Sequence, residues 1–294
     1  EVGYATLLAS VTYPDGLPKG LSDFYYRGVG EFVKLGWRTF DADRVQGEVL
    51  KLDEPWFALL RPMDLHEPNL SGDYNYAGRI GELDLPLANL VEAVLGKCPD
   101  TVVVLTADHG QGLGERDMWN HRQGLWWFLT HVPLVYSHPS FGGRECHALH
   151  QHMDLTATLA GLCGVDFHSE GVDWSHYLRE GAVPGHGLRE KVIGYSMGSE
   201  RKMLGDYDRL WRYRSVRTYF WSYYEKHRRQ VWAEPELYMA LCDPSEQRNL
   251  AGEVEFASKV AELRMLMGWP DGAEYTVEEE DAVLKRLRAI GYAD

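Results

Sequence analysis

The chain has 294 residues, of which 45% are hydrophobic and 25% are charged, and its formal net charge is −14. This length and composition suit one or two globular domains with a sizeable core. The negative charge argues against nucleic acid or an anionic membrane as the main partner, and no apolar run is long enough to span a bilayer. The four cysteines lack CxxC spacing, so they predict neither a disulfide framework nor a zinc cluster.

The first half of the chain alternates predicted strands with predicted helices. The Gly- and Pro-rich residues 12–32 indicate a loop after a short first strand. Further strands are predicted at residues 56–61, 101–107 and 132–139, and helices at residues 42–52, 76–97 and 152–165. The strand at 101–107 is apolar on both faces, as expected for a central strand between helices. The pattern predicts an α/β fold with a mostly parallel central sheet flanked by helices and lacking its first elements.

The second half has a different pattern. Residues 215–241 are aromatic and alternating, which predicts a small antiparallel sheet, and residues 276–294 predict a closing helix with acidic residues early and basic residues late. We therefore predict two domains: residues 1–185 form the α/β domain, and residues 186–294 form a C-terminal subdomain of antiparallel strands with a closing helix.

Polar side chains follow two of the predicted strands, where sites form in open α/β sheets. These side chains, with those of the segment after the second strand, are Asp64, His66, Glu67, Asp108, His109, Asn120, His121 and Arg122. Carboxylate oxygens and imidazole nitrogens together suit a divalent cation. Two simpler interpretations stay open: Asp108 and His109 as a strand-to-loop corner with backbone hydrogen bonds, and His66 as a surface histidine.

A glycine-rich loop follows the second cluster. Gly110, Gly112 and Gly114 have GxGxG spacing rather than GxGxxG, and no P-loop lysine follows them. A nucleotide-binding fold is therefore disfavoured.

Six sequence segments carry a family resemblance through their order and spacing. They are EVGYATLLA with GLSDFYYRG, PWFALLRPMDLHEP, DTVVVLTADHGQGLGE with VPLVY, HMDLTATLAGLCGV, ELYMALCDPSEQRNLA and EEEDAVLKRLRAIGY. Together they resemble the sulfatase family of the alkaline-phosphatase superfamily over nearly the whole chain. The resemblance implies hydrolysis of sulfate esters, with a small-molecule or carbohydrate sulfate ester as the substrate.

The resemblance also implies a divalent-metal site. By resemblance, Asp108 and His109 are metal ligands, with Ca²⁺ as the preferred ion and Mg²⁺ or Mn²⁺ as alternatives. Such a cation neutralises charge on the non-bridging oxygens and lowers the pKa of the attacking group. His66 would contact the sulfate or protonate the leaving group.

A second group of predicted site residues follows from the stretch WNHRQGLWWFLTHVPL. His121 lies where many family members carry Lys and some carry His, so the resemblance implies a cationic contact with the ester. Arg122 is the near alternative for this contact, and Asn120 would support either residue in substrate binding.

The chain also departs from the family pattern. The C/S-x-P-x-R nucleophile motif and the first-strand Asp-Asp pair should precede the first segment, and neither occurs in this chain. We therefore expect an N-terminally incomplete chain that binds metal weakly and is inactive alone. Cys242 in CDPSE mimics the motif, but it lies in the C-terminal turn with Glu246 in place of Arg.

A GKWH stretch expected after the first segment is also absent. Two alternatives therefore stay open beside sulfate-ester hydrolysis. One is a phosphonate or phosphodiester hydrolase of the same superfamily, and the other is a non-catalytic sulfatase-like binding protein. A phosphotransferase or mutase is disfavoured by the sulfatase-like C-terminal hairpin.

Overall fold

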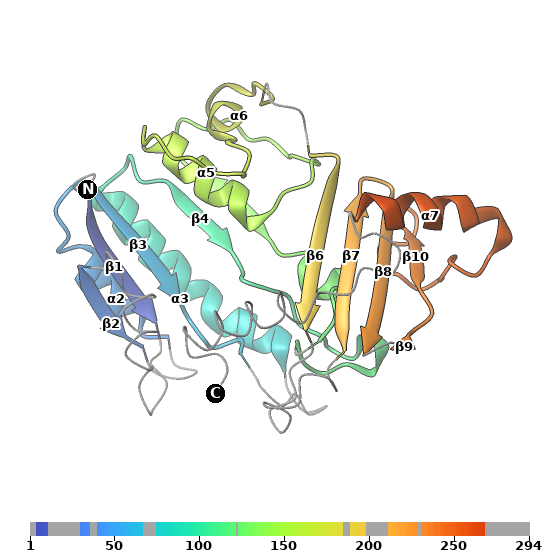
Figure 1. Cartoon of the computed structure of the whole chain (residues 1–294). Coiled ribbons are helices and arrows are strands. Elements are labelled where there is room, and N and C mark those ends of the chain that lie inside the picture. The colour runs from blue at the N-terminus through green and yellow to red at the C-terminus, as the bar shows by residue number, and fades with distance from the viewer. Residues whose placement is uncertain are drawn as a thin grey trace, which may run out of the picture. The chain divides into compact units, whose positions relative to one another are not determined.

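The computed structural model describes residues 4–10, 30–35, 40–66, 75–121, 123–184, 189–197, 211–228 and 231–267. These residues belong to two compact units (Figure 1). The first unit extends to Val103 and includes Ser137–Pro139, and the second contains Val104–Tyr136 and the residues after Pro139. The fold is mixed α/β with a small antiparallel sheet toward the C-terminus, which confirms the predicted fold class.

The first unit is built on a parallel three-stranded sheet in the order β2-β1-β3. Its strands are β1 (Ala5–Ser10), β2 (Glu31–Lys34) and β3 (Trp56–Arg61), and its helices are α2 (Ala42–Val49) and α3 (Tyr76–Lys97). The predicted strand at 56–61 and the predicted helix at 76–97 are confirmed, and the helix predicted at 42–52 is confirmed over Ala42–Val49. The predicted loop was wrong at Glu31 and Phe32, which belong to β2 because this short strand is defined by pairing with β1.

The core of the first unit lies between this sheet and the two helices. Side chains from all these elements are buried in it, including Leu7, Val33, Val45 and Leu90. Both helices begin at a polar cap: Asp41 accepts from the backbone N–H of Arg44 at 3.0 Å, and Asn75 accepts from that of Gly78 at 2.9 Å. Burial alternates along β3: Trp56, Ala58 and Leu60 form the face of the strand that packs against this core.

Two short strands, except for their end residues Val103 and Ser137, and three helices form the start of the second unit. β4 (Val103–Thr106) pairs with β5 (Leu134–Ser137), and the helices are α4 (Trp127–Thr130), α5 (His152–Leu162) and α6 (Ser175–Glu180), with a 3₁₀ turn η1 (Glu115–Asp117). Gly164 follows α5 in the left-handed conformation with φ of +66°, which glycine adopts readily where a helix ends. Leu105 of β4 is 55% exposed, so the expected burial of this strand on both faces is not seen.

The rest of the second unit is the antiparallel sheet, in the order β10-β8-β7-β6 with β9 paired to β8. Its strands are β6 (Lys191–Met197), β7 (Arg212–Thr218), β8 (Trp221–Arg228), β9 (Val231–Trp232) and β10 (Glu236–Met239). A 3₁₀ turn η3 (Val254–Phe256) leads into helix α7 (Ala257–Leu266), whose Leu263 packs with Val216, Tyr223 and Leu237 in one core. This sheet confirms the predicted antiparallel strands.

Two further predictions concern the C-terminal part of the chain. The predicted closing helix at 276–294 lies outside the described residues. The predicted domain boundary between residues 185 and 186 stays a prediction. Within the described part of the chain, no helix combines the length and apolar character needed to cross a membrane.

Candidate active site

The Asp108–His109 pair lies directly after β4, in the second unit. Both side chains reach solvent, with exposed fractions of 60% for Asp108 and 44% for His109. His109 Nδ1 lies 2.9 Å from the carbonyl oxygen of Gly110, and a carbonyl oxygen only accepts, so Nδ1 carries the proton. The lone pair of His109 is therefore on Nε2, 3.8 Å from Asp108 Oδ1. A carboxylate oxygen and an imidazole lone pair thus lie side by side at the molecular surface.

His121 lies against this pair. Its ring stacks on that of His109 with centroids 4.2 Å apart and an interplanar angle of 26°. The lone pairs of nitrogen atoms lie in the ring planes, so two nearly parallel stacked rings do not direct them at one ion. In this arrangement, His121 is not a second imidazole ligand for an ion held by His109.

Gln111 orients His121 and was not predicted. The amide nitrogen of Gln111 donates to the carbonyl oxygen of Gly112 at 3.1 Å, which turns its Oε1 toward His121 Nδ1 at 2.9 Å. His121 therefore donates through Nδ1 and carries its lone pair on Nε2. Its position could have indicated a place in the site, because Gln111 follows the Asp-His-Gly triplet directly.

The backbone after the pair is bonded to α4. The amides of Gly110 and Gln111 donate to the carbonyl oxygens of Leu129 at 2.8 Å and Phe128 at 3.1 Å. A Cβ atom on Gly110 would lie 2.0 Å from the Phe128 oxygen, so only glycine permits this approach. The glycine at position 110 thus serves backbone packing rather than a phosphate cradle.

Two further side chains hold the segment around the pair. His152, at the start of α5, donates through Nε2 to the carbonyl oxygen of Ala107 at 2.8 Å, one residue before Asp108. Arg116 has a φ of 53°, in the left-handed region that costs a non-glycine residue about 1–3 kcal/mol. Its guanidinium bonds Glu236 at 2.8 Å and Tyr238 at 2.6 Å, which anchors the loop to β10.

The surroundings of Arg116 favour the charged form of its guanidinium. Burial alone would lower the pKa of the Arg116 guanidinium, but the hydrogen bond to Tyr238 and the charge of Glu236 outweigh burial and raise it. The ring of Trp126 also lies 4.8 Å from the guanidinium carbon, and its indole N–H donates to Glu236 at 3.0 Å. The loop that carries His121 is therefore fixed to the antiparallel sheet by a charged, partly buried contact.

Among the other predicted residues that the structure describes, Asp64 and His66 lie in the first unit and Asn120 lies beside His121 in the loop. Asp64 and His66 follow β3 in the first unit, where Asp64 is 8% exposed and accepts from the backbone N–H of Phe40 at 3.0 Å. The carbonyl oxygen of Asn120 accepts from the N–H of Gly112 at 3.2 Å. Arg122 and Glu67 lie outside the described residues. The structure thus brings together Asp108, His109 and His121, and their predicted roles stay predictions.

The donor chemistry of the pair fits a divalent cation in part. A ligating histidine typically donates its other ring N–H to a carbonyl or carboxylate, as His109 does to Gly110. Among the described residues, no group of three or more His, Cys, Asp or Glu side chains is arranged to hold a metal ion. Oxygen-preferring cations take about six ligands, so Asp108 and His109 supply only part of such a site.

Comparison with known proteins places these residues in a family context. Residues 42–165 match the family model described as Sulfatase, a range that includes His66, Asp108, His109 and His121. An N-acetylglucosamine-6-O-sulfatase from Bacteroides thetaiotaomicron is 25% identical over 207 residues, which are 68% of this chain and 33% of that protein. The chain spans about a third of the length of such curated relatives.

Solved structures share the fold. A 2-O GAG sulfatase aligns with a TM-score of 0.69 and 17% identity, over 99% of this chain and 78% of that one. The phosphonate monoester hydrolase of Agrobacterium radiobacter aligns with a TM-score of 0.66 and 18% identity, over 90% and 77%. The class is therefore an α/β protein with the alkaline-phosphatase-like fold. The family match over residues 42–165 and the curated relatives show that this part of the chain is similar to the sulfatases.

Proposed function

We propose that the protein hydrolyses sulfate esters, with Asp108 and His109 as ligands of a divalent cation. The observation that carries the proposal is the Asp108–His109 corner itself. It pairs a carboxylate oxygen with an imidazole nitrogen that bears the lone pair, 3.8 Å apart and exposed to solvent, inside the segment matched to the sulfatase family. Asp108 Oδ1 also accepts from the backbone N–H of His109 at 3.1 Å, which is the bond expected of a strand-to-loop corner, so it is the exposure of both side chains that favours a ligand role.

Asp108 and His109 would hold the cation together with ligands from outside the described residues. When bound, the cation neutralises charge on the non-bridging ester oxygens, and Ca²⁺ is the ion we propose, with Mg²⁺ and Mn²⁺ as alternatives. The hydrogen bond from His109 Nδ1 to Gly110 leaves the lone pair on Nε2, so the protein sets the tautomer before an ion arrives.

His66 and His121 would act on the ester itself. We assign His66 to contact with the sulfate or to protonation of the leaving oxygen, and His121 to a second polar contact with the ester. The Gln111 side chain accepts from His121 Nδ1, which keeps His121 in the tautomer whose lone pair is on Nε2. Asn120 and Arg122 are proposed as substrate-binding neighbours of His121.

The substrate class we propose is a carbohydrate sulfate. Its support is the named activity of the curated relative, which is a sulfatase of N-acetylglucosamine, and of the structural relative, which acts on 2-O sulfate of a GAG. The chain lacks a C/S-x-P-x-R motif, so the nucleophile would come from another part of the gene product, and this chain alone would not turn over substrate.

A second candidate is phosphonate or phosphodiester hydrolysis. The phosphonate monoester hydrolase shares the fold with nearly the same TM-score as the sulfatase neighbour. Both chemistries present anionic oxygens to a cation, so the described residues favour neither. The family match is the reason to place sulfate esters first.

The test uses the complete gene product and a panel of saccharide sulfates, phosphonate monoesters and phosphodiesters. Sulfate release is measured by ion chromatography and phosphorus products by ³¹P NMR. We expect sulfate release that falls at least ~100-fold in Asp108→Asn, the size typical for loss of a group that stabilises transition-state charge. Asp117→Asn is the matched control, because this carboxylate lies in the same loop and is exposed. Faster turnover of a phosphorus ester than of every sulfate would establish the second candidate instead.

A further inference from the structure

One buried carboxylate in the second unit is bonded to the segment that carries the proposed site. Glu246 lies in the turn after β10, is 4% exposed and has a φ of 55°. Its backbone N–H donates to the carbonyl oxygen of Asp243 at 3.0 Å, which closes the turn. This is the CDPSE turn, whose glutamate has no part in the proposed chemistry. A non-glycine residue in the left-handed region persists where its surroundings hold it, so its contacts are of interest.

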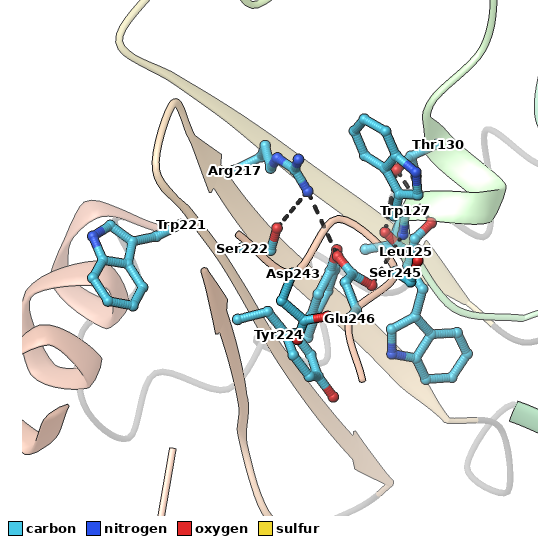
Figure 2. A network of polar contacts seen from close by, with 12 residues as sticks. Leu125, Trp127, Thr130, Arg217, Trp221, Ser222, Tyr224, Asp243, Ser245 and Glu246 are labelled. Carbon is cyan, nitrogen blue, oxygen red and sulfur yellow. Dashed lines mark hydrogen bonds and ion pairs between the residues drawn. The ribbon is translucent and has the colours of Figure 1, made fainter. Parts of the chain in front are cut away.

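The contacts of Glu246 reach strands on one side and α4 on the other (Figure 2). Its Oε1 accepts from the Tyr224 hydroxyl of β8 and lies 3.6 Å from Arg217 Nη1 of β7. Its Oε2 accepts from the backbone N–H of Trp127, the first residue of α4, at 3.2 Å. The carboxylate thus joins the antiparallel sheet to α4 through charge-assisted hydrogen bonds.

A second contact uses the backbone of the same residue. The carbonyl oxygen of Glu246 accepts from Arg116 Nη2 at 3.3 Å. Arg116 lies in the loop between Gly110 and His121, and Trp127 lies just after that loop. Glu246 therefore contacts residues 110–127 at two points. Its side chain accepts from the backbone of Trp127, and its carbonyl oxygen accepts from the side chain of Arg116.

Helix α4 connects Glu246 to the backbone that follows Asp108 and His109. The carbonyl oxygens of Phe128 and Leu129 in α4 accept from the amides of Gln111 and Gly110, at 3.1 and 2.8 Å. These two amides follow His109 directly. Every bond in the series from Glu246 to Gly110 lies within the second unit.

We infer that Glu246 is a positioning residue of the proposed site: its buried carboxylate fixes α4, and α4 fixes the backbone that follows Asp108 and His109. The hydrogen-bonded series stands on its own, while the consequence for catalysis rests on the proposed function. Trp127 has a further restraint on the same side, because the Arg217 guanidinium carbon lies 4.5 Å from its ring.

The chemistry of the two oxygens predicts how substitutions differ. Tyr224, Trp127 and Arg217 all present donors, and a carboxylate accepts at both oxygens. Glutamine has one acceptor oxygen, so it keeps the Trp127 bond when its amide nitrogen donates to the Tyr224 hydroxyl oxygen. Alanine keeps neither bond. Glu246→Gln is therefore the conservative variant, and it should keep most of the restraint on Trp127 that Glu246→Ala removes.

The experiment is hydrogen exchange on the 294-residue chain, read at the amides of Gly110 and Gln111. Glu225→Gln is the matched control, because Glu225 is also buried, at 3% exposure, in the same sheet, and its bonds go to Arg214, Arg264 and Tyr223 instead. Global stability of each variant is measured by urea unfolding, so that exchange through complete unfolding can be subtracted.

For Glu246→Ala, we expect exchange at Gly110 and Gln111 to rise about tenfold beyond the global contribution, the size of a lost charged hydrogen bond. Glu246→Gln should show a smaller rise, and Glu225→Gln none. The inference is overturned if the two amides in Glu246→Ala exchange only as its global stability dictates, or no faster than in Glu225→Gln. If Glu246→Ala does not fold, the comparison of Glu246→Gln with Glu225→Gln decides in the same way.

A catalytic readout separates this inference from the proposed function. In the complete gene product, Glu246→Gln should lower kcat for the best sulfate ester about threefold to tenfold with KM nearly unchanged, while Glu225→Gln should change neither. If the gene product hydrolyses no sulfate ester, the proposed function fails and the exchange measurement still decides the positioning role. If kcat is unchanged while exchange rises, Glu246 restrains the backbone of residues 110 and 111 without affecting catalysis, and the inference is overturned.

Discussion

Replacing Gly110 with alanine tests how the candidate site is held. A methyl carbon at this position would lie 2.0 Å from the Phe128 carbonyl oxygen. Carbon–oxygen contacts normally begin near ~3.3 Å, so the two backbones must separate by roughly 1.3 Å. Such a shift breaks the hydrogen bonds from Gly110 to Leu129 and from Gln111 to Phe128. At about 0.5–1.5 kcal/mol each, their loss lowers the free energy of unfolding by about 1–3 kcal/mol.

Urea unfolding followed by tryptophan fluorescence measures this loss, and hydrogen exchange locates it at residues 110 and 111. Gly81→Ala in α3 is the control, because a Cβ there meets nothing within 4 Å. That variant should gain about 0.5–1 kcal/mol, the difference in helix propensity between glycine and alanine. The reasoning is refuted if Gly110→Ala unfolds at the wild-type urea concentration with both amides still protected.

Two further predictions concern the antiparallel sheet. Burial alone would raise the pKa of Glu225, but hydrogen bonds from Tyr223 and Arg264 and the charge of Arg214 lower it. Its contribution to stability is therefore present above the unfolded-state pKa and lost as pH falls through the lower folded-state pKa, so the urea midpoint should drop below about pH 4. Glu225→Gln should flatten that drop, and an unchanged pH profile would contradict the assignment. Leu237→Ala, at a fully buried position, should cost about 2–5 kcal/mol in the same unfolding assay, and a loss below ~1 kcal/mol would contradict its core position.

Some elements could be predicted from their local sequence alone. In β3, the continuous apolar run from Trp56 to Leu60 marks the strand, although only Trp56, Ala58 and Leu60 pack inward while Phe57 and Leu59 are exposed. The strands β2 and β6 have no such mark, because each is defined by pairing with a strand elsewhere in the chain.

The candidate site, too, could be predicted only where its residues are close together in the sequence. Asp108 and His109 are neighbours in sequence, so their pairing could be predicted, and the stacking of His109 on His121 bridges only a short loop. The residues that hold this loop could not be predicted from local pattern. Arg116 bonds Tyr238 across 122 residues, and Glu246 bonds Trp127 across 119. No spacing rule relates such positions, because the fold alone brings them together.

The central claim is that Asp108 and His109 bind a divalent cation, and Mn²⁺ tests it most directly. Mn²⁺ is added in small amounts to the ¹⁵N-labelled 294-residue chain, and paramagnetic broadening is read residue by residue. The net charge of −14 predicts weak binding at many carboxylates, so the order of broadening matters rather than its presence. The account predicts that amides 108–110 broaden first and that Asp108→Asn removes this effect while Asp117→Asn does not. Equal broadening in wild type and Asp108→Asn would contradict it.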